Sequence, residues 1–324
     1  TGLGTGDLIM NSRTGLQITG NNMTLLNNIA ITLDTTGALT SSGSNNEIQG
    51  NVTLKGNTNT FALNNASDSL TISGNILDDS ATSLVARDLT KIGAGNLILT
   101  GTNSYTGNTI INGGTITINN DRALGAVPTN ETANSIQLSG GNLALAAGAN
   151  TVTLNANRDI LMSSASTISS GTGSTFAIAS KINKAGNDLT FSGAGNITAS
   201  NIISGSGALN LNGSGTVALN AVNTYTGATY LNSGTLSVGN NAGLGASTLH
   251  MAGGALQVGS AGMNIANAIV LDTAATFGGS NSFTLSGVIS GTNGITKTGS
   301  NTLTLANSNT YSGGTTLSSG TLSI

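Results

Sequence analysis

Few residues of the 324-residue sequence could perform acid–base chemistry. His250 is the only histidine, there is no cysteine, and the charged side chains number 9 basic and 12 acidic. Asp78 and Asp79 are the only adjacent acids, which makes them the candidates that a polysaccharide-acting enzyme would use. Catalysis of this kind needs gathered, perturbed groups, and zinc sites need Cys and His ligands. The sequence therefore predicts a non-enzyme without catalytic residues, cofactor-binding residues, cofactors or metal sites.

The remaining charged residues have a simpler interpretation than catalysis. His250 stands in STLHMAGG, where we expect a strand that turns the imidazole toward solvent. Arg87, Asp88 and Lys91 are close in sequence, and we expect them to form a charge group on the surface.

Composition also excludes several classes of partner. The formal net charge of −3 is spread without runs, so no basic patch for nucleic acid is present. No apolar stretch approaches the roughly 20 residues of a membrane-spanning helix, so we expect no membrane insertion by this segment.

The positions whose spacing is most informative belong to an internal repeat. Copies at 89–118, 210–238 and 295–324 each place an Asn two residues before a Tyr, a Gly two residues after it and another Gly nine residues after it. These structural positions are Asn103, Tyr105, Gly107 and Gly114; Asn223, Tyr225, Gly227 and Gly234; and Asn309, Tyr311, Gly313 and Gly320. After the first two copies the chain reads ALGA at 123–126 and GLGA at 243–246. Such periodicity is typical of solenoids, whose units must stack to bury their apolar faces.

Strict alternation of apolar with small polar residues predicts strands that position these residues. We expect strands near 97–100, 108–112 and 115–118, with Leu97, Val217 and Leu303 pointing inward. Three short strands separated by Gly and Asn corners predict one turn of a three-faced coil, in an all-β protein without significant helix. Parallel stacking favours a right-handed β-helix over 1–324, continuous and part of a longer protein.

The tyrosines and asparagines admit two interpretations each. The tyrosines could form an exposed sugar-binding platform, but a tyrosine that packs over a solenoid corner uses the same spacing. We favour packing, because aromatic residues are only 3% of the chain. The asparagines are expected to bond backbone at the corner or to adopt a left-handed conformation there.

The copies closely resemble the passenger-associated transport repeat of autotransporters, the type V secreted proteins of Gram-negative bacteria. The resemblance rests on GAGNLILTGTNSYTGNTIINGGTITI and its two partners, and departs from the family pattern at Asn301, where Gly95 and Gly215 stand in the other copies. It implies a β-helical passenger at the bacterial cell surface, secreted or attached to the outer membrane, of the kind that adhesins and self-associating proteins contain. Expected partners are then host-cell or neighbouring-cell surface molecules, or further copies of the chain itself.

Three other functions remain open on the sequence alone. A filament or matrix subunit could assemble by stacking of solenoid coils. A polysaccharide-acting β-helix would use Asp78 and Asp79, and an ice-binding face could use the threonines of TITI, TLTL and TLSI.

Overall fold

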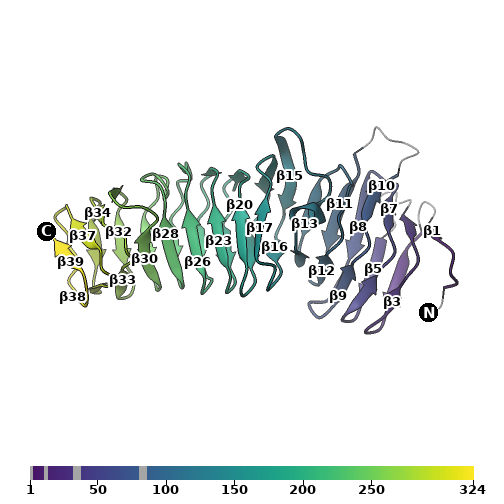
Figure 1. Ribbon diagram of the computed structural model, residues 1–324, viewed down its shortest axis with the longest axis horizontal. Coiled ribbons are helices and arrows are strands. Elements are labelled where there is room, and N and C mark those ends of the chain that lie inside the picture. Colours follow the sequence, from purple (N-terminus) through teal and green to yellow (C-terminus); the bar gives the residue numbers. More distant parts are fainter. Residues whose placement is uncertain (1–2, 11–13, 32–37, 80–85) are drawn as a thin grey trace. The chain divides into compact units, whose positions relative to one another are not determined.

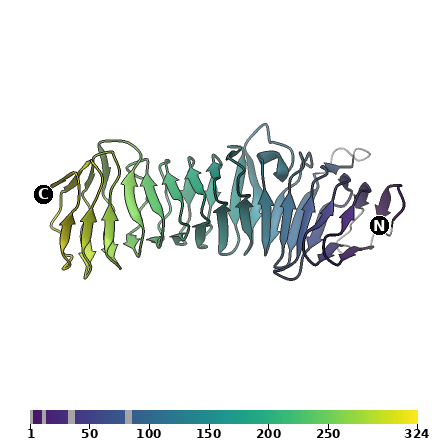
Figure 2. The same ribbon diagram turned by 60° about the horizontal axis from the view of Figure 1, so that its bottom comes forward.

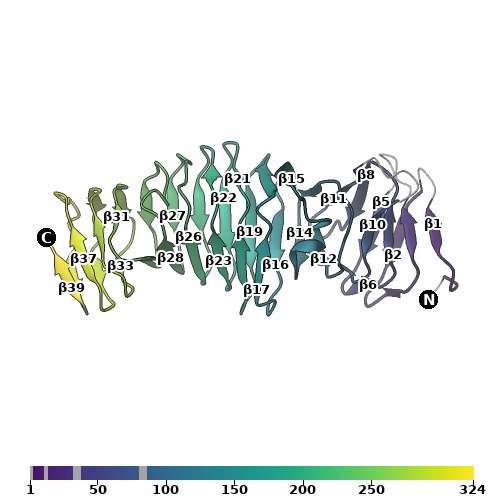
Figure 3. The same cartoon turned by 45° about the horizontal axis from the view of Figure 1, so that its top comes forward.

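The computed structural model describes residues 3–10, 14–31, 38–79 and 86–324. The chain divides into two compact units, Thr1–Ser166 and Thr167–Ile324. Each unit by itself is a parallel β-solenoid, and the chain makes about 14 turns in all. Figure 1 shows the strands of each unit side by side, and Figures 2 and 3 show the same stacking from two further directions.

The strands of the first unit fall into three stacks. One stack holds β1 (Leu8–Met10), β4 (Ile29–Ile31), β7 (Val52–Leu54) and β10 (Ile76–Asp78). The second holds β2 (Leu16–Thr19), β5 (Ala38–Ser42), β8 (Thr58–Ala62), β11 (Asp88–Ile92), β13 (Thr109–Asn112), β15 (Thr132–Leu138) and β18 (Arg158–Met162). The third holds β3 (Thr24–Leu25), β6 (Asn46–Ile48), β9 (Ser69–Ile72), β12 (Asn96–Leu99), β14 (Thr115–Ile118) and β16 (Asn142–Leu145). This unit also contains β17 (Thr151–Leu154) and a 3-10 turn, η2 (Asp121–Leu124).

The second unit repeats this arrangement. One stack holds β20 (Thr175–Ile178), β23 (Asn196–Ala199), β26 (Thr216–Leu219), β28 (Thr235–Val238), β30 (Ala255–Val258), β33 (Ala275–Phe277), β36 (Ile295–Lys297) and β38 (Thr315–Leu317). Another holds β22 (Leu189–Ser192), β25 (Leu209–Leu211), β27 (Thr229–Leu231), β29 (Leu249–Met251), β32 (Ile269–Leu271) and β35 (Ile289–Gly291). The remaining strands are β21 (Ile182–Asn183) with β24 (Ile203–Ser204), and β31 (Met263–Ile265), β34 (Phe283–Leu285), β37 (Thr302–Leu305) and β39 (Thr321–Ser323). β19 (Ser166–Ser170) contains the boundary between the units.

The core of each unit consists of inward ladders of apolar side chains, as the alternation predicts. Leu97 and Leu303 are fully buried and Val217 is 5% exposed. In register, Leu97 pairs with Leu70 on one side and Ile116 on the other, so like side chains stack along the coil axis. Thr and Ser alternate with them on the outer side, where β-branched and small polar residues suit a half-solvated strand.

The pattern of faces differs from the expectation in one respect. The strands near 97–100 and 115–118 are β12 and β14, which pair with each other and occupy one face in successive coils. One coil therefore takes 19 residues here, from Leu97 to Ile116, and a single repeat copy spans parts of two coils. Its third face is made by the residues around the tyrosine, which form no strand between β12 and β13.

Candidate functional site

Each repeat tyrosine lies at a corner that takes the place of a strand. In the first copy the N–H of Ser104 donates to the carbonyl of Ile76 in β10, at 2.9 Å. The corresponding bonds in the other copies are Thr224 to Ile203 in β24, at 3.0 Å, and Thr310 to Ile289 in β35, at 2.9 Å. We call residues 102–108, 222–228 and 308–314 the tyrosine corners; each continues the face of the strand below it.

The asparagine of each corner links successive coils through its side-chain amide. Asn103 Oδ1 accepts from the N–H of Ile76 at 2.8 Å, and its Nδ2 donates to the carbonyl of Ala123 at 2.6 Å. Asn223 repeats both bonds, with the N–H of Ile203 and the carbonyl of Gly243. Neither residue has a positive φ, so hydrogen bonding to backbone, and not a left-handed conformation, explains the asparagine.

The tyrosines of the first two corners are core residues. Tyr105 and Tyr225 are fully buried, and their hydroxyls bond Thr109 Oγ1 at 2.7 Å and Thr229 Oγ1 at 2.8 Å. Burial raises the pKa of Tyr225 to about 12 and raises that of Tyr105 as well, so both phenols stay neutral at physiological pH. They supply packing and one satisfied hydroxyl each, and they offer no platform to a sugar.

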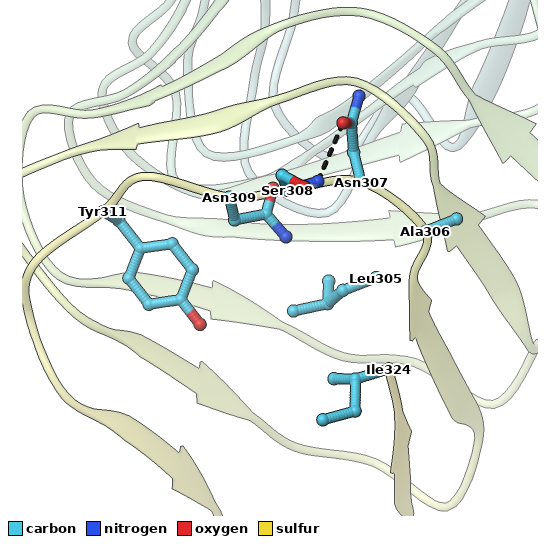
Figure 4. Close-up of a pocket in the computed structure, with 7 residues that line it drawn as sticks. All are labelled: Leu305, Ala306, Asn307, Ser308, Asn309, Tyr311 and Ile324. Atoms are coloured by element: carbon cyan, nitrogen blue, oxygen red, sulfur yellow. Dashed lines mark hydrogen bonds between the residues drawn. The ribbon is translucent and has the colours of Figure 1, made fainter.

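The third corner is more open. Tyr311 keeps the bond of its hydroxyl to Thr315 Oγ1, at 2.7 Å, but it is half-buried and lines a cavity of about 490 Å³. Figure 4 shows Tyr311 facing the same opening as Leu305 and Ile324, while Asn307 Oδ1 accepts from the N–H of Ser308. Asn309 accepts from the N–H of Ile289 at 2.8 Å, as its counterparts do from their strands.

The two repeat glycines are required for different reasons. A Cβ on Gly227 would lie 2.1 Å from the carbonyl oxygen of Gly207, and one on Gly107 or Gly313 would lie 2.2 Å from a backbone carbon of the coil below. Gly114, Gly234 and Gly320 have φ of +62°, +71° and +72°, which glycine adopts without the usual steric cost. The first glycine permits close approach of coils, and the second permits the turn between two strands.

The segments ALGA and GLGA complete the first two corners. The N–H of Ala126 donates to the carbonyl of Tyr105 at 2.9 Å, and that of Ala246 donates to Tyr225 at 3.1 Å. Leu124 and Leu244 are buried beside them. The sequence shows that these segments recur, but it gives no sign that they cover the tyrosine backbone.

The expectation of a surface charge group at 87–91 is wrong. Lys91 is fully buried, and its ammonium donates to the carbonyls of Ile92 and Gly93, at 2.9 and 2.8 Å. Arg87 is buried too and bonds the carbonyl of Lys55, while Asp88 Oδ1 accepts from the N–H of Asn108 at 2.7 Å. The three charges are thus divided among three separate backbone contacts.

Two further lysines are buried in the same way. Lys297 donates to the carbonyl of Gly299 at 3.1 Å, and Lys184 donates to that of Gly207 and lies 4.6 Å from the centre of the Tyr225 ring. Desolvation lowers the pKa of Lys91 and of Lys184 to about 8 and lowers that of Lys297. The repeat alignment carries a signal for this, because Leu211 occupies in the second copy the inward position of Lys91 and Lys297.

We expect Lys91→Leu to fold and to be more stable than Lys91→Ala by about 2–5 kcal/mol, the usual difference between leucine and alanine in a core. The second copy already holds Leu211 at this position, and replacing a buried charge by a well-packed apolar group is often neutral or stabilising. Urea denaturation followed by circular dichroism measures both variants. Equal stability of the two would contradict the burial of this side chain.

The remaining candidates for chemistry are dispersed. His250 lies on the outer side of β29, as expected, where its Nδ1 is 3.0 Å from Asp272 Oδ2 and its ring stacks on Tyr230 with centroids 4.6 Å apart. Asp78 Oδ2 accepts from both the N–H and the hydroxyl of Thr106, at 2.9 and 2.6 Å, so it supports the first tyrosine corner. In the part of the chain that the structure describes, no group of three or more His, Cys, Asp or Glu could hold a metal ion.

Comparison with known proteins agrees with this geometry. The family model of the passenger-associated transport repeat matches residues 89–118, 209–238 and 295–324, the ranges that contain the tyrosine corners. The chain is also 32% identical over 146 residues to the adhesin BmaC autotransporter of Brucella suis biovar 1 (strain 1330). The chain thus carries three passenger-associated transport repeats.

The aligned part covers 45% of this chain but only 4% of the Brucella adhesin. No solved structure matches the chain. Among the residues that the structure describes, no helix is both long and apolar enough to cross a membrane.

Proposed function

We propose that this chain is a non-enzymatic segment of an autotransporter passenger on the surface of a Gram-negative bacterium, where it serves adhesion or self-association. The observation that carries the proposal is the use of its repeat positions for packing. Asn, Tyr and Gly of the corners are bonded to backbone or fitted against it, and the buried lysines bond carbonyls, which leaves these positions no role in catalysis. The name of the Brucella relative, an adhesin, supports the adhesive part of the proposal.

The enzymatic alternative finds little support in the described residues. Asp78 is committed to the tyrosine corner, and the backbone N–H of the neighbouring Asp79 donates to the carbonyl of Leu54 at 3.0 Å. His250 pairs with Asp272 on an outer face, but its other described contact is the ring of Tyr230, and no nucleophilic hydroxyl is bonded to it among the described residues. A glycosidase would instead hold two carboxylates about 5–10 Å apart across one groove.

The proposal is tested by expressing the full natural protein in a non-adherent Gram-negative strain. We expect surface labelling by an antibody against 167–324, and an increase of at least several fold in attachment to epithelial cells or in settling of the culture by aggregation. A strain that displays the protein but shows neither effect would contradict the proposed function. Mixing labelled expressing cells with unlabelled non-expressing cells separates the two roles, because self-association excludes the non-expressing cells from aggregates.

A further inference from the structure

The first tyrosine corner carries an insertion that the second lacks. Thr109 in β13 pairs with Ile136, 27 residues later, whereas its counterpart Thr229 in β27 pairs with Leu249, 20 residues later. Seven extra residues therefore lie between β13 and β15, the strand that pairs with it in the next coil. They follow Ala126 as residues 127–133, of which 127–131 form a loop and 132–133 begin β15 (Figure 1). In repeat proteins, insertions of this kind extend from one face and often form the binding surface.

The insertion and the first corner line an open cavity of about 310 Å³. Thr106 and Asn108 belong to the corner and Asn130 belongs to the loop. Thr132 and Ser135 come from β15, and Arg158 comes from β18. The volume lies at the lower end of the range for ligand pockets, which start at about 300 Å³.

Hydrogen bonds from Asn157 and Arg158 hold the loop and the turn that precedes it. Arg158 is 2% exposed; its Nε donates to Asp121 Oδ1 at 3.0 Å, and its guanidinium also donates to the carbonyls of Leu124 and Gly125, at 2.9 and 2.8 Å. Asn157 Nδ2 donates to the carbonyl of Pro128 at 2.9 Å. The pocket is thus formed before any ligand arrives, which lowers the cost of binding.

The walls combine neutral polar groups with apolar surface. Arg158 is the only charged side chain among the lining residues, and its charge is balanced by Asp121. Glu131 belongs to the insertion but does not line the pocket. The other lining residues include Asn108, Asn130, Thr106, Thr132 and Ser135, whose amides and hydroxyls can both donate and accept hydrogen bonds, and the apolar Ala126, Val127 and Pro128.

We propose that this pocket binds one residue of a neutral glycan. A neutral sugar presents hydroxyls that alternate as donor and acceptor, which the walls can match without leaving a buried charge unpaired. An anionic ligand would need a free cation, and the Arg158 guanidinium is already bonded to Asp121 and to carbonyls. The inference rests on the proposed adhesive function for its biological use, but the binding event itself can be measured on the isolated chain.

The test is saturation-transfer difference NMR on the 324-residue chain, with glucose, galactose, mannose and N-acetylglucosamine as neutral probes and N-acetylneuraminic acid and glucose 6-phosphate as anionic ones. We expect at least one neutral sugar to bind with a Kd on the order of 1 mM, since a ligand of this size reaches such an affinity at an ordinary efficiency per atom. No transfer to any neutral probe, or transfer to the anionic probes alone, would overturn the proposal.

The second copy supplies the matched variants. Deleting 127–133 leaves Ala126 followed by two residues and Ile136, which reproduces Ala246, two residues and Leu249; this variant should lose binding. Asn108→Ala copies Ala228 and should weaken binding about fivefold or more, and Asn108→Trp should abolish it by filling the cavity. Thr226→Ala, at the corner without a pocket, should bind as the parent does. Binding that survives both the deletion and Asn108→Trp would place the site elsewhere and refute the inference.

These measurements are independent of the cell assay. A chain that binds a neutral sugar in solution while the displayed protein causes no attachment would contradict the adhesive function and leave the pocket intact. Attachment that is unchanged by the deletion and by Asn108→Trp, with no sugar bound in solution, would refute the pocket and leave the adhesive function intact.

Discussion

Replacing Tyr225 with alanine is expected to lower the free energy of unfolding of the 167–324 unit by about 3–5 kcal/mol, the usual cost of deleting a buried aromatic side chain. Tyr225 is fully buried at its corner, and its ring contacts the ammonium of Lys184. Because the corner replaces a strand, few other side chains fill the space that alanine would leave. Urea denaturation followed by far-ultraviolet circular dichroism measures the change.

Two control variants separate the contribution of the Tyr225 ring to stability from that of its hydroxyl and from that of other side chains in the corner. Tyr225→Phe should cost only about 1 kcal/mol, since Thr229 Oγ1 keeps a second partner in Ser247 Oγ at 3.0 Å. Val222→Ala lies in the same corner but on a side chain that is 57% exposed, and it should change stability by less than about 0.5 kcal/mol. A loss from Tyr225→Ala no larger than that from Val222→Ala would mean that the tyrosine does not support the corner.

The positions of the corners also argue against a row of binding platforms. In the second unit, the corner of Tyr225 stacks on β24, whereas that of Tyr311 stacks on β35, and these strands belong to different stacks. The two corners therefore lie on different faces of the solenoid, and they cannot present their tyrosines to the same surface. Their common function is therefore local, at the junction of each corner with the strand beneath it.

The sequence predicts the ladders of the fold well because alternation has a direct physical cause. Leu97, Val217 and Leu303 are buried as expected, since one face of every strand must leave water. The assignment of faces failed because a repeat copy is longer than a coil: of its four strands, β12 and β14 occupy one face, and β11 and β13 occupy another. Sequence similarity identifies the length of the repeated segment, whereas the length of a coil is determined by how the strands stack.

Residue type misled the prediction at Lys91. A lysine is normally solvated, which favours the surface, whereas its position two residues after the buried Leu89 places it on the same inward face of β11. Leu211 at the matching position is the better guide to burial. The pocket beside the first corner could not have been predicted at all, because its walls come from residues 106–158, and only the fold brings the loop over the corner.

The stability of the chain is expected to increase as the pH rises from about 8 to about 10. Burial lowers the pKa of Lys91 and of Lys184 from 10.5 to about 8, so in this interval the folded chain binds fewer protons than the unfolded chain. Stability rises with pH wherever the unfolded state binds more protons. Each lysine should contribute about 1–3 kcal/mol over this interval, less where its hydrogen bonds to carbonyls retain the charged form.

The buried tyrosines determine the pH at which this increase in stability ends. Their pKa is raised, to about 12 for Tyr225, so above pH 10 the unfolded chain loses protons that the folded chain keeps. Stability should then fall again, which gives a maximum near pH 10. The measurement is the urea midpoint at constant ionic strength between pH 7 and 11.

The variants Lys91→Leu and Lys184→Leu test whether these two lysines cause the rise in stability between pH 8 and 10. Each variant should lose about half of the rise between pH 8 and 10, and the double variant most of it, because the two lysines share no hydrogen-bond partner. Both leucines should leave the decrease above pH 10 in place, since that decrease belongs to the tyrosines. A urea midpoint that does not rise between pH 8 and 10 in the parent chain would mean that the lysines are solvated in the folded state. The packing around Gly93 and Gly207 would then have to be reconsidered.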